Sequence, residues 1–120
     1  SIFMSEITIY HNPRCSKSRQ TLALLEERGV SPEVILYLET PPAEAKLKDI
    51  LAKLGMPPRE LMRKGEAEYK DNNFKDSSLS DADLLAAMVK FPKLIERPIV
   101  VKGNKAKIGR PPESVLELLN

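Results

Sequence analysis

Cys15 is the only cysteine of this 120-residue chain, and it lies among basic residues. Arg14 precedes it, and Lys17 and Arg19 follow closely. A turn ends just before Cys15 and a helix starts just after it, so unpaired backbone N–H groups and the helix dipole favour a thiolate. We therefore predict a reactive thiol with a lowered pKa, in a place that also suits anions. The other interpretation is an inert cysteine beneath a solvated basic helix face.

The residues missing around Cys15 limit its chemistry. A lone cysteine forms no internal disulfide, and Ser18 stands where a C-x-x-C pair would have its second thiol. Thr21 occupies the place of the arginine that a tyrosine-phosphatase-like loop needs. His11, the single histidine, lies in the same turn, so it either hydrogen-bonds its own loop or tunes the thiol. One cysteine and one histidine cannot form a structural zinc site. Because the chain has no second cysteine, a redox reaction at Cys15 needs a thiol from outside the chain.

Two arginines are each followed by proline, in Arg97-Pro98 and Arg110-Pro111. The proline keeps the preceding residue extended, so each arginine projects from a fixed backbone. A guanidinium pairs bidentately with a tetrahedral oxyanion. We expect both arginines to converge on the loop that carries Cys15 as an oxyanion clamp, although spacing alone also allows two solvated surface groups.

The elements that position these residues follow from the hydrophobic pattern. Residues 7–10 predict a strand, and a helix is expected from Ser16 until Gly29 ends it. The continuous apolar run Val34–Leu38 predicts a strand covered on both faces. Together these segments form a βαβ unit with Cys15 at its first junction.

The remaining chain predicts a helical block and then a hairpin. We expect helices over 47–54 (ended by Gly55), over 58–63 and from a cap at Ser80, with a connecting loop over 70–78. Residues 98–101 and 105–108 flank Gly103-Asn104 as a β-hairpin, and Pro112 opens a last helix. This order of elements predicts an α/β fold class and resembles the thioredoxin-like fold: we expect one domain over residues 1–120, with a small mixed four-stranded sheet and a helical insertion between its second and third strands.

The composition and charge limit the kinds of binding partner to expect. The formal charge of +2 is too small to imply nucleic acid or a membrane, so any anion site is local. No apolar run approaches the roughly 20 residues that cross a bilayer, and no secretion signal is evident, so we expect a cytoplasmic monomer. Residues 1–3 precede Met4, and we interpret them as a non-native extension.

Five ordered segments resemble one protein family. They carry the likeness across residues 7–119, and they are ITIYHNPRCSKSR (7–19), LYLETPP (36–42), RELMRK (59–64), ERPIVV (96–101) and GRPPE (109–113). The chain resembles the glutaredoxin-coupled arsenate reductases, the ArsC family, and particularly their YfgD-like branch.

The resemblance implies a mechanism. Cys15 would be the nucleophile that attacks arsenate, while Arg63, Arg97 and Arg110 would hold the oxyanion and its covalent adduct. Glutathione, as co-substrate, would then carry out a displacement at the arsenic atom. Glutaredoxin would remove the glutathione as a mixed disulfide, and arsenite would leave. No bound cofactor is implied, and the cellular role would be arsenic detoxification.

The resemblance also gives roles to three neighbours of the thiol. His11 and Ser18 match positions of the family whose side chains lie close to the active cysteine and help to lower the pKa of that cysteine. Pro98 matches the cis-proline that thioredoxin-like folds place beside the active cysteine.

Two alternatives share this fold. Spx-like regulators bind RNA polymerase and commonly carry C-x-x-C, which Ser18 abolishes here, and their role does not call for three arginines around one thiol. A family member that binds oxyanions without arsenate turnover is the other alternative. Ser16-Lys17 favours it, because the well-established reductases tend to have Gly-Thr there.

Overall fold

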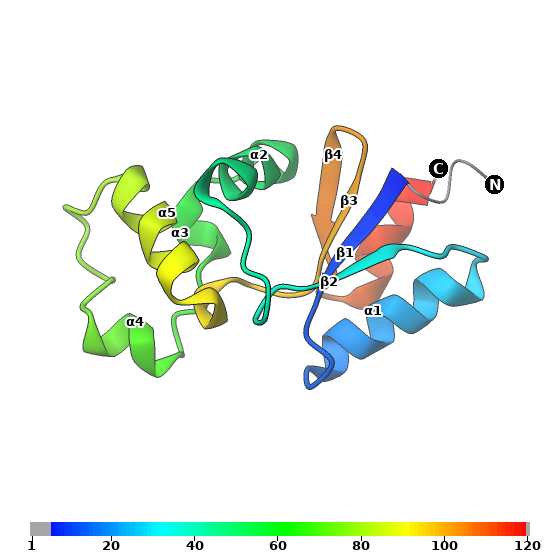
Figure 1. Ribbon diagram of the computed structural model, residues 1–120, viewed down its shortest axis with the longest axis horizontal. Coiled ribbons are helices and arrows are strands. Elements are labelled where there is room, and N and C mark those ends of the chain that lie inside the picture. The colour runs from blue at the N-terminus through cyan, green and yellow to red at the C-terminus, as the bar shows by residue number, and fades with distance from the viewer. Residues whose placement is uncertain (1–5, 120) are drawn as a thin grey trace. The chain divides into compact units, whose positions relative to one another are not determined.

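The computed structural model describes residues 6–119, so the three residues interpreted as a non-native extension lie outside the described part. The chain divides into two compact units (Figure 1). The sheet unit comprises the residues up to Thr40 and those from Arg97 onward, and the helical unit is Pro41–Glu96. Across the described residues, no helix has the length and apolar character needed to span a membrane.

The sheet unit is built on four strands in the order β2-β1-β3-β4. They are β1 (Ile7–His11), β2 (Glu33–Leu36), β3 (Ile99–Lys102) and β4 (Lys105–Ile108). The inner strand β1 is parallel to β2 and antiparallel to β3, which forms a hairpin with β4. This confirms the predicted thioredoxin-like architecture, a mixed sheet interrupted by helices between its second and third strands.

Two helices cover one face of this sheet, as Figure 1 shows for α1 (Ser16–Glu27) and the 3₁₀ helix η3 (Pro112–Leu119). The predicted last helix is therefore present, in 3₁₀ form. The buried core between helices and strands consists of Ile7, Ile9, Leu25, Val30, Val100, Val115 and Leu118. This packing fixes the N-terminus of α1 relative to the end of β1, which is the junction that carries Cys15.

Strand β2 differs from its prediction as a strand covered on both faces. It lies at an edge of the sheet, and Val34 is 43% exposed. The strand also ends at Leu36, where the backbone N–H groups of Glu39 and Thr40 donate to the Leu36 carbonyl and form a turn. A short apolar run predicts a strand, but it does not distinguish a central strand from an edge strand.

The helical unit contains α2 (Glu44–Leu54), α3 (Pro58–Leu61), α4 (Ala67–Asp71), α5 (Asp81–Lys90) and the 3₁₀ turn η2 (Pro92–Leu94). Helices α2 and α3 and the turn η2 pack against α5. The predicted start of α5 is a capping box, because Ser80 accepts from the Asp83 N–H and the Asp83 carboxylate accepts from the Ser80 N–H.

Helix α4 was not predicted, and its last two residues lie in the expected loop. It is short and polar, with Tyr69 as its buried anchor, so it lacks the repeat that reveals an amphipathic helix. Arg59 fixes the following segment, since its guanidinium donates to the carbonyl oxygens of Phe74 (2.7 Å) and Asp76 (2.8 Å).

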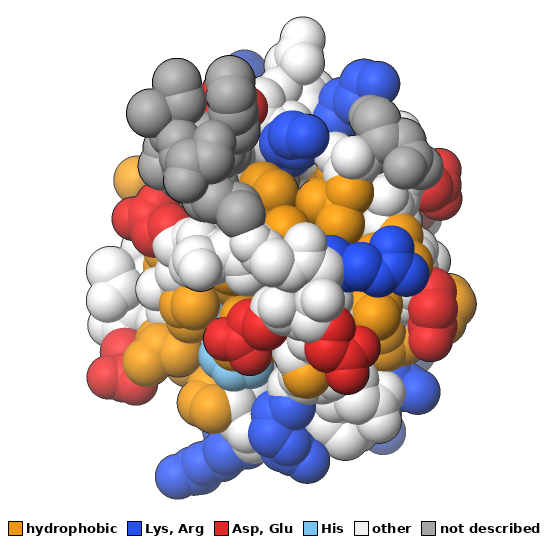
Figure 2. All heavy atoms as spheres, turned by 90° about the vertical axis from the view of Figure 1, so that its right-hand side faces the viewer, with side chains coloured by type: hydrophobic (Ala, Val, Ile, Leu, Met, Phe, Trp, Pro, Cys, Tyr) orange, Lys and Arg blue, Asp and Glu red, His pale blue; other side chains and the backbone are white. Residues whose placement is uncertain are grey.

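Charges of both signs mix on the surface. In the face drawn in Figure 2, acidic and basic side chains are interspersed with small groups of hydrophobic ones. That distribution agrees with the net charge of +2. Attraction of an anion therefore depends on how a few side chains are grouped.

Candidate active site

Cys15 occupies the N-cap position of α1, with an extended backbone (φ −95°, ψ 123°). Its N–H donates to the Asn12 carbonyl (3.0 Å), and its own carbonyl accepts from the Arg19 N–H (3.0 Å). The first bond closes the turn after β1, and the second opens the helix. The half-buried thiol is thereby fixed at the positive end of α1.

The pKa of Cys15 lies below its ordinary value. Partial burial alone would raise the pKa, but the backbone N–H of Ser18, the Arg97 guanidinium and the backbone N–H of Lys17 outweigh burial by stabilising the thiolate. The sequence had suggested basic side chains next to Cys15 as the source of positive charge. The side chain that lowers this pKa is instead Arg97, which comes from the far end of the chain.

Arg110 is a second arginine beside the thiol. Its Nη2 is 3.6 Å from Cys15 Sγ, and its Nε donates to the Arg97 carbonyl (2.9 Å), which fixes the plane of the guanidinium. The peptide bonds Arg97-Pro98 and Arg110-Pro111 are both cis. The structure thus brings to one sulfur the two arginines that the sequence singled out, a grouping suited to a tetrahedral oxyanion.

Gly109 allows the segment that carries Arg110 to pass close to Thr21 and Pro98. A Cβ at Gly109 would collide with the Thr21 side chain and would lie 2.7 Å from the Pro98 ring. We expect Gly109→Ala to lower the free energy of unfolding by about 1–3 kcal/mol, the usual cost of overpacking. Urea denaturation measures this free energy of unfolding. Gly65→Ala is the matched control, because a Cβ at Gly65 meets nothing within 4 Å. Equal stability of the two variants would contradict the close approach.

His11 and Ser18 form a buried pair that joins the two ends of the loop. His11 Nδ1 lies 2.6 Å from Ser18 Oγ, and the Asn12 N–H donates to the same oxygen (3.0 Å). Asn12, which the sequence argument missed, also holds the loop through its Oδ1, the acceptor of the Arg14 N–H (3.0 Å). The Asn-Pro turn signal could have revealed it. Ser18 therefore connects the loop to the helix turn that faces the thiol.

The pKa of His11 is lowered, first by burial and then by the positive charge of Arg19, against a smaller opposing effect of Glu26. Between the folded-state pKa and about 6.5, the unfolded chain binds more protons at this site than the folded chain does. Stability should therefore rise with pH through that interval and level off above it.

We expect His11→Asn, which keeps an atom near Nδ1, to reduce the loss of stability on going from pH 7 to pH 5.5. Urea unfolding at both pH values measures this loss, and NMR titration of the single histidine ring gives the pKa directly. A ring that titrates at or above 6.5 would contradict the assignment.

Arg63 belongs to the helical unit. Its Nη1 donates to Glu96 Oε1 (2.7 Å) and its Nε to Glu66 Oε2 (3.2 Å). Burial alone would lower the pKa of Arg63, but these two carboxylates raise it. The sequence analysis had not identified either glutamate. Glu66 is three residues from Arg63, so an ion pair could have been sought there, whereas Glu96 lies 33 residues away and no local signal connects it with Arg63.

Comparisons with known proteins show the family to which the chain belongs. The ArsC family model matches residues 10–118. The uncharacterized protein YfgD of Escherichia coli (strain K12) is 63% identical over 95% of this chain and 97% of its own length. An arsenate reductase of Haemophilus influenzae is 51% identical, over 94% of this chain and 98% of its own. The solved arsenate reductase from Vibrio cholerae is 57% identical with a TM-score of 0.91, covering 92% of this chain and 95% of its own. The chain belongs to the ArsC family.

Proposed function

We propose that this protein reduces arsenate to arsenite through Cys15 as its single nucleophile, with glutathione and glutaredoxin as electron donors. One observation carries the proposal: a thiol of lowered pKa at a helix N-terminus, with Arg97 and Arg110 beside the sulfur. Relatives named arsenate reductase support the choice of oxyanion. The proposal includes arsenic detoxification in the cytoplasm by a monomer that binds no cofactor.

The reaction can be written so that atoms and electrons balance. The Cys15 thiolate attacks arsenic and expels one oxygen as water, and glutathione replaces a second oxygen, again as water. The glutaredoxin thiolate then attacks the glutathione sulfur, and the electron pair of the S–As bond reduces As(V) to As(III). Water finally releases arsenite and the free thiol. The sum is H₃AsO₄ + GSH + glutaredoxin-SH → H₃AsO₃ + glutaredoxin-S–SG + H₂O.

Each group near the sulfur has a place in this scheme. Arg97 and Arg110 would neutralise the oxyanion and the developing charge on its oxygens. The resemblance to the family assigns Arg63 to the oxyanion as well, and its two glutamate partners use N–H groups on Nε and Nη1, so other donors of its five remain. His11 and Ser18 would tune the thiol by holding the loop and the first turn of α1.

A component-omission assay tests the proposal. Arsenate-dependent oxidation of NADPH is followed with glutathione, glutaredoxin and glutathione reductase, and each component is left out in turn. We expect turnover with the full set and none without glutathione or without glutaredoxin. Arsenate binding without turnover would favour the oxyanion-binding alternative, and turnover with thioredoxin alone would contradict the proposed donor.

A further inference from the structure

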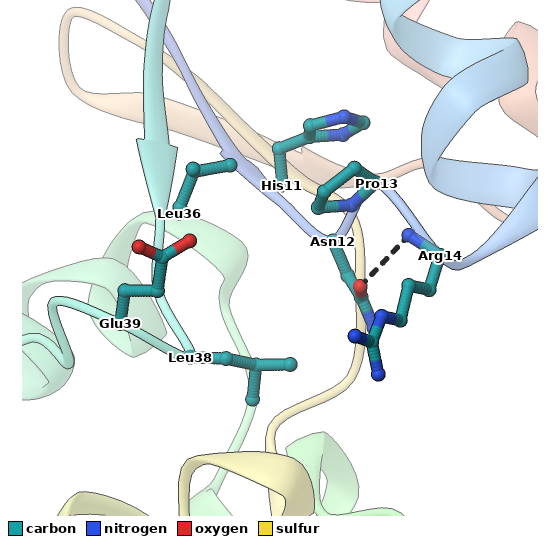
Figure 3. Close-up of a pocket in the computed structure, with 7 residues that line it drawn as sticks. All are labelled: His11, Asn12, Pro13, Arg14, Leu36, Leu38 and Glu39. Carbon is teal, nitrogen blue, oxygen red and sulfur yellow. Dashed lines mark hydrogen bonds between the residues drawn. The ribbon is translucent and has the colours of Figure 1, made fainter.

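A pocket lies next to the active-site loop. It has a volume of about 260 Å³ and lies between the turn after β1 and the segment after β2 (Figure 3). We call it the turn pocket, and its lining residues are His11, Asn12, Pro13, Arg14, Leu36, Leu38 and Glu39. The volume is slightly below the roughly 300–1,000 Å³ of small-molecule sites, so it would hold one end of a small ligand.

The turn pocket carries one charge of each sign. Figure 3 shows the Glu39 carboxylate and the Arg14 guanidinium on opposite sides, with Leu36 near the carboxylate and the Leu38 side chain extending between the two charges. Among the described residues, neither Glu39 nor Arg14 forms a salt bridge, so both charges can meet a ligand.

This charge pattern selects for a particular ligand chemistry. An acidic group opposes a second oxyanion, so the turn pocket is unsuited to arsenate. A carboxylate paired with Arg14 and an ammonium paired with Glu39 suit the free amino-acid end of a small molecule. The exposed Leu38 offers apolar contact to the ligand's methylene groups.

We propose that the turn pocket binds the γ-glutamyl end of the thiol co-substrate, a zwitterionic tripeptide thiol of the glutathione type. This rests on the proposed function, which requires such a thiol at Cys15. Arg14 directly precedes Cys15, so their Cα atoms are about 3.8 Å apart, and the turn pocket is lined by the residue next to the reactive one. A tripeptide bound by its γ-glutamyl end would extend its own thiol from there toward the arsenic adduct.

Steady-state kinetics test the proposal with Glu39→Gln. We expect the KM for glutathione to rise about tenfold, the size of one charge-assisted contact, with the KM for arsenate unchanged. Glu33→Gln, another exposed glutamate of the same edge region, is the matched control. With glutathione acetylated on its γ-glutamyl amine, wild type and Glu39→Gln should have the same KM. A Glu39→Gln enzyme indistinguishable from Glu33→Gln would overturn the proposal while leaving the reductase function intact.

A binding measurement separates the two proposals. The Cys15→Ser protein is titrated with S-methylglutathione, which lacks a reactive thiol, and amide NMR shifts are followed. We expect shifts concentrated at residues 11–14 and 36–39 even in a protein without turnover. Absence of binding, or shifts confined to other residues, would overturn the turn pocket as a thiol site whatever the arsenate assay shows.

Discussion

Replacing Cys15 with serine should abolish arsenate reduction. We expect kcat/KM to fall by about four orders of magnitude or more, because the hydroxyl is a much weaker nucleophile and the chain holds no second thiol. The NADPH-coupled assay measures this loss. Urea unfolding should be close to that of wild type, since the half-buried thiol and the hydroxyl are similar in size.

A matched control moves the thiol by one residue. The double variant Cys15→Ser/Ser16→Cys keeps one cysteine in the chain but places it at the exposed first residue of α1. We expect no recovery of activity, because the arrangement of Arg97 and Arg110 is built around the N-cap position. Recovery of more than a few per cent of wild-type activity would show that the site does not depend on this geometry.

Arg110→Ala should lower kcat/KM for arsenate by about 10²–10³-fold, the usual cost of removing one preorganised charge donor from a site of developing negative charge. Arg110→Lys should recover little, because one ammonium cannot both reach the sulfur and donate to the Arg97 carbonyl as the guanidinium fork does. The measurement is the arsenate dependence of turnover at saturating glutathione.

Arg28→Ala is the control for Arg110→Ala, since Arg28 is an exposed arginine at the C-terminal end of α1. It removes the same charge from the same unit and should leave kcat/KM unchanged. If Arg110→Ala and Arg28→Ala gave the same kinetics, Arg110 would be only a surface group.

The fold was largely predictable because its elements have strong local signals. Gly55 ends α2 with a φ of 71°, and Ser80 and Asp83 form the capping box of α5. The edge position of β2 was not predictable from Val34 and its neighbours, because burial depends on which strands pair. Helix α4 gave no signal, because its five residues are too few for a repeat.

The site was predictable in its residue types but not in its connections. Proline after Arg97 and Arg110 singled out two arginines, yet only the fold shows that the Arg97 carbonyl orients Arg110. The pairing of Arg63 with Glu96 spans 33 residues, so no local pattern could reveal it. The close approach of Gly109, the residue after β4, to Thr21 of α1 likewise depends on tertiary packing.

The most direct test of the account is the rate at which iodoacetamide alkylates Cys15, measured against pH with and without arsenate. Cys15 is the only cysteine, so the label reports on this thiol alone. We predict a midpoint below the value of about 8.5 for a free thiol, and slower alkylation when arsenate occupies the site. A midpoint at the free-cysteine value, with alkylation that arsenate does not slow, would contradict a thiolate built into an oxyanion pocket.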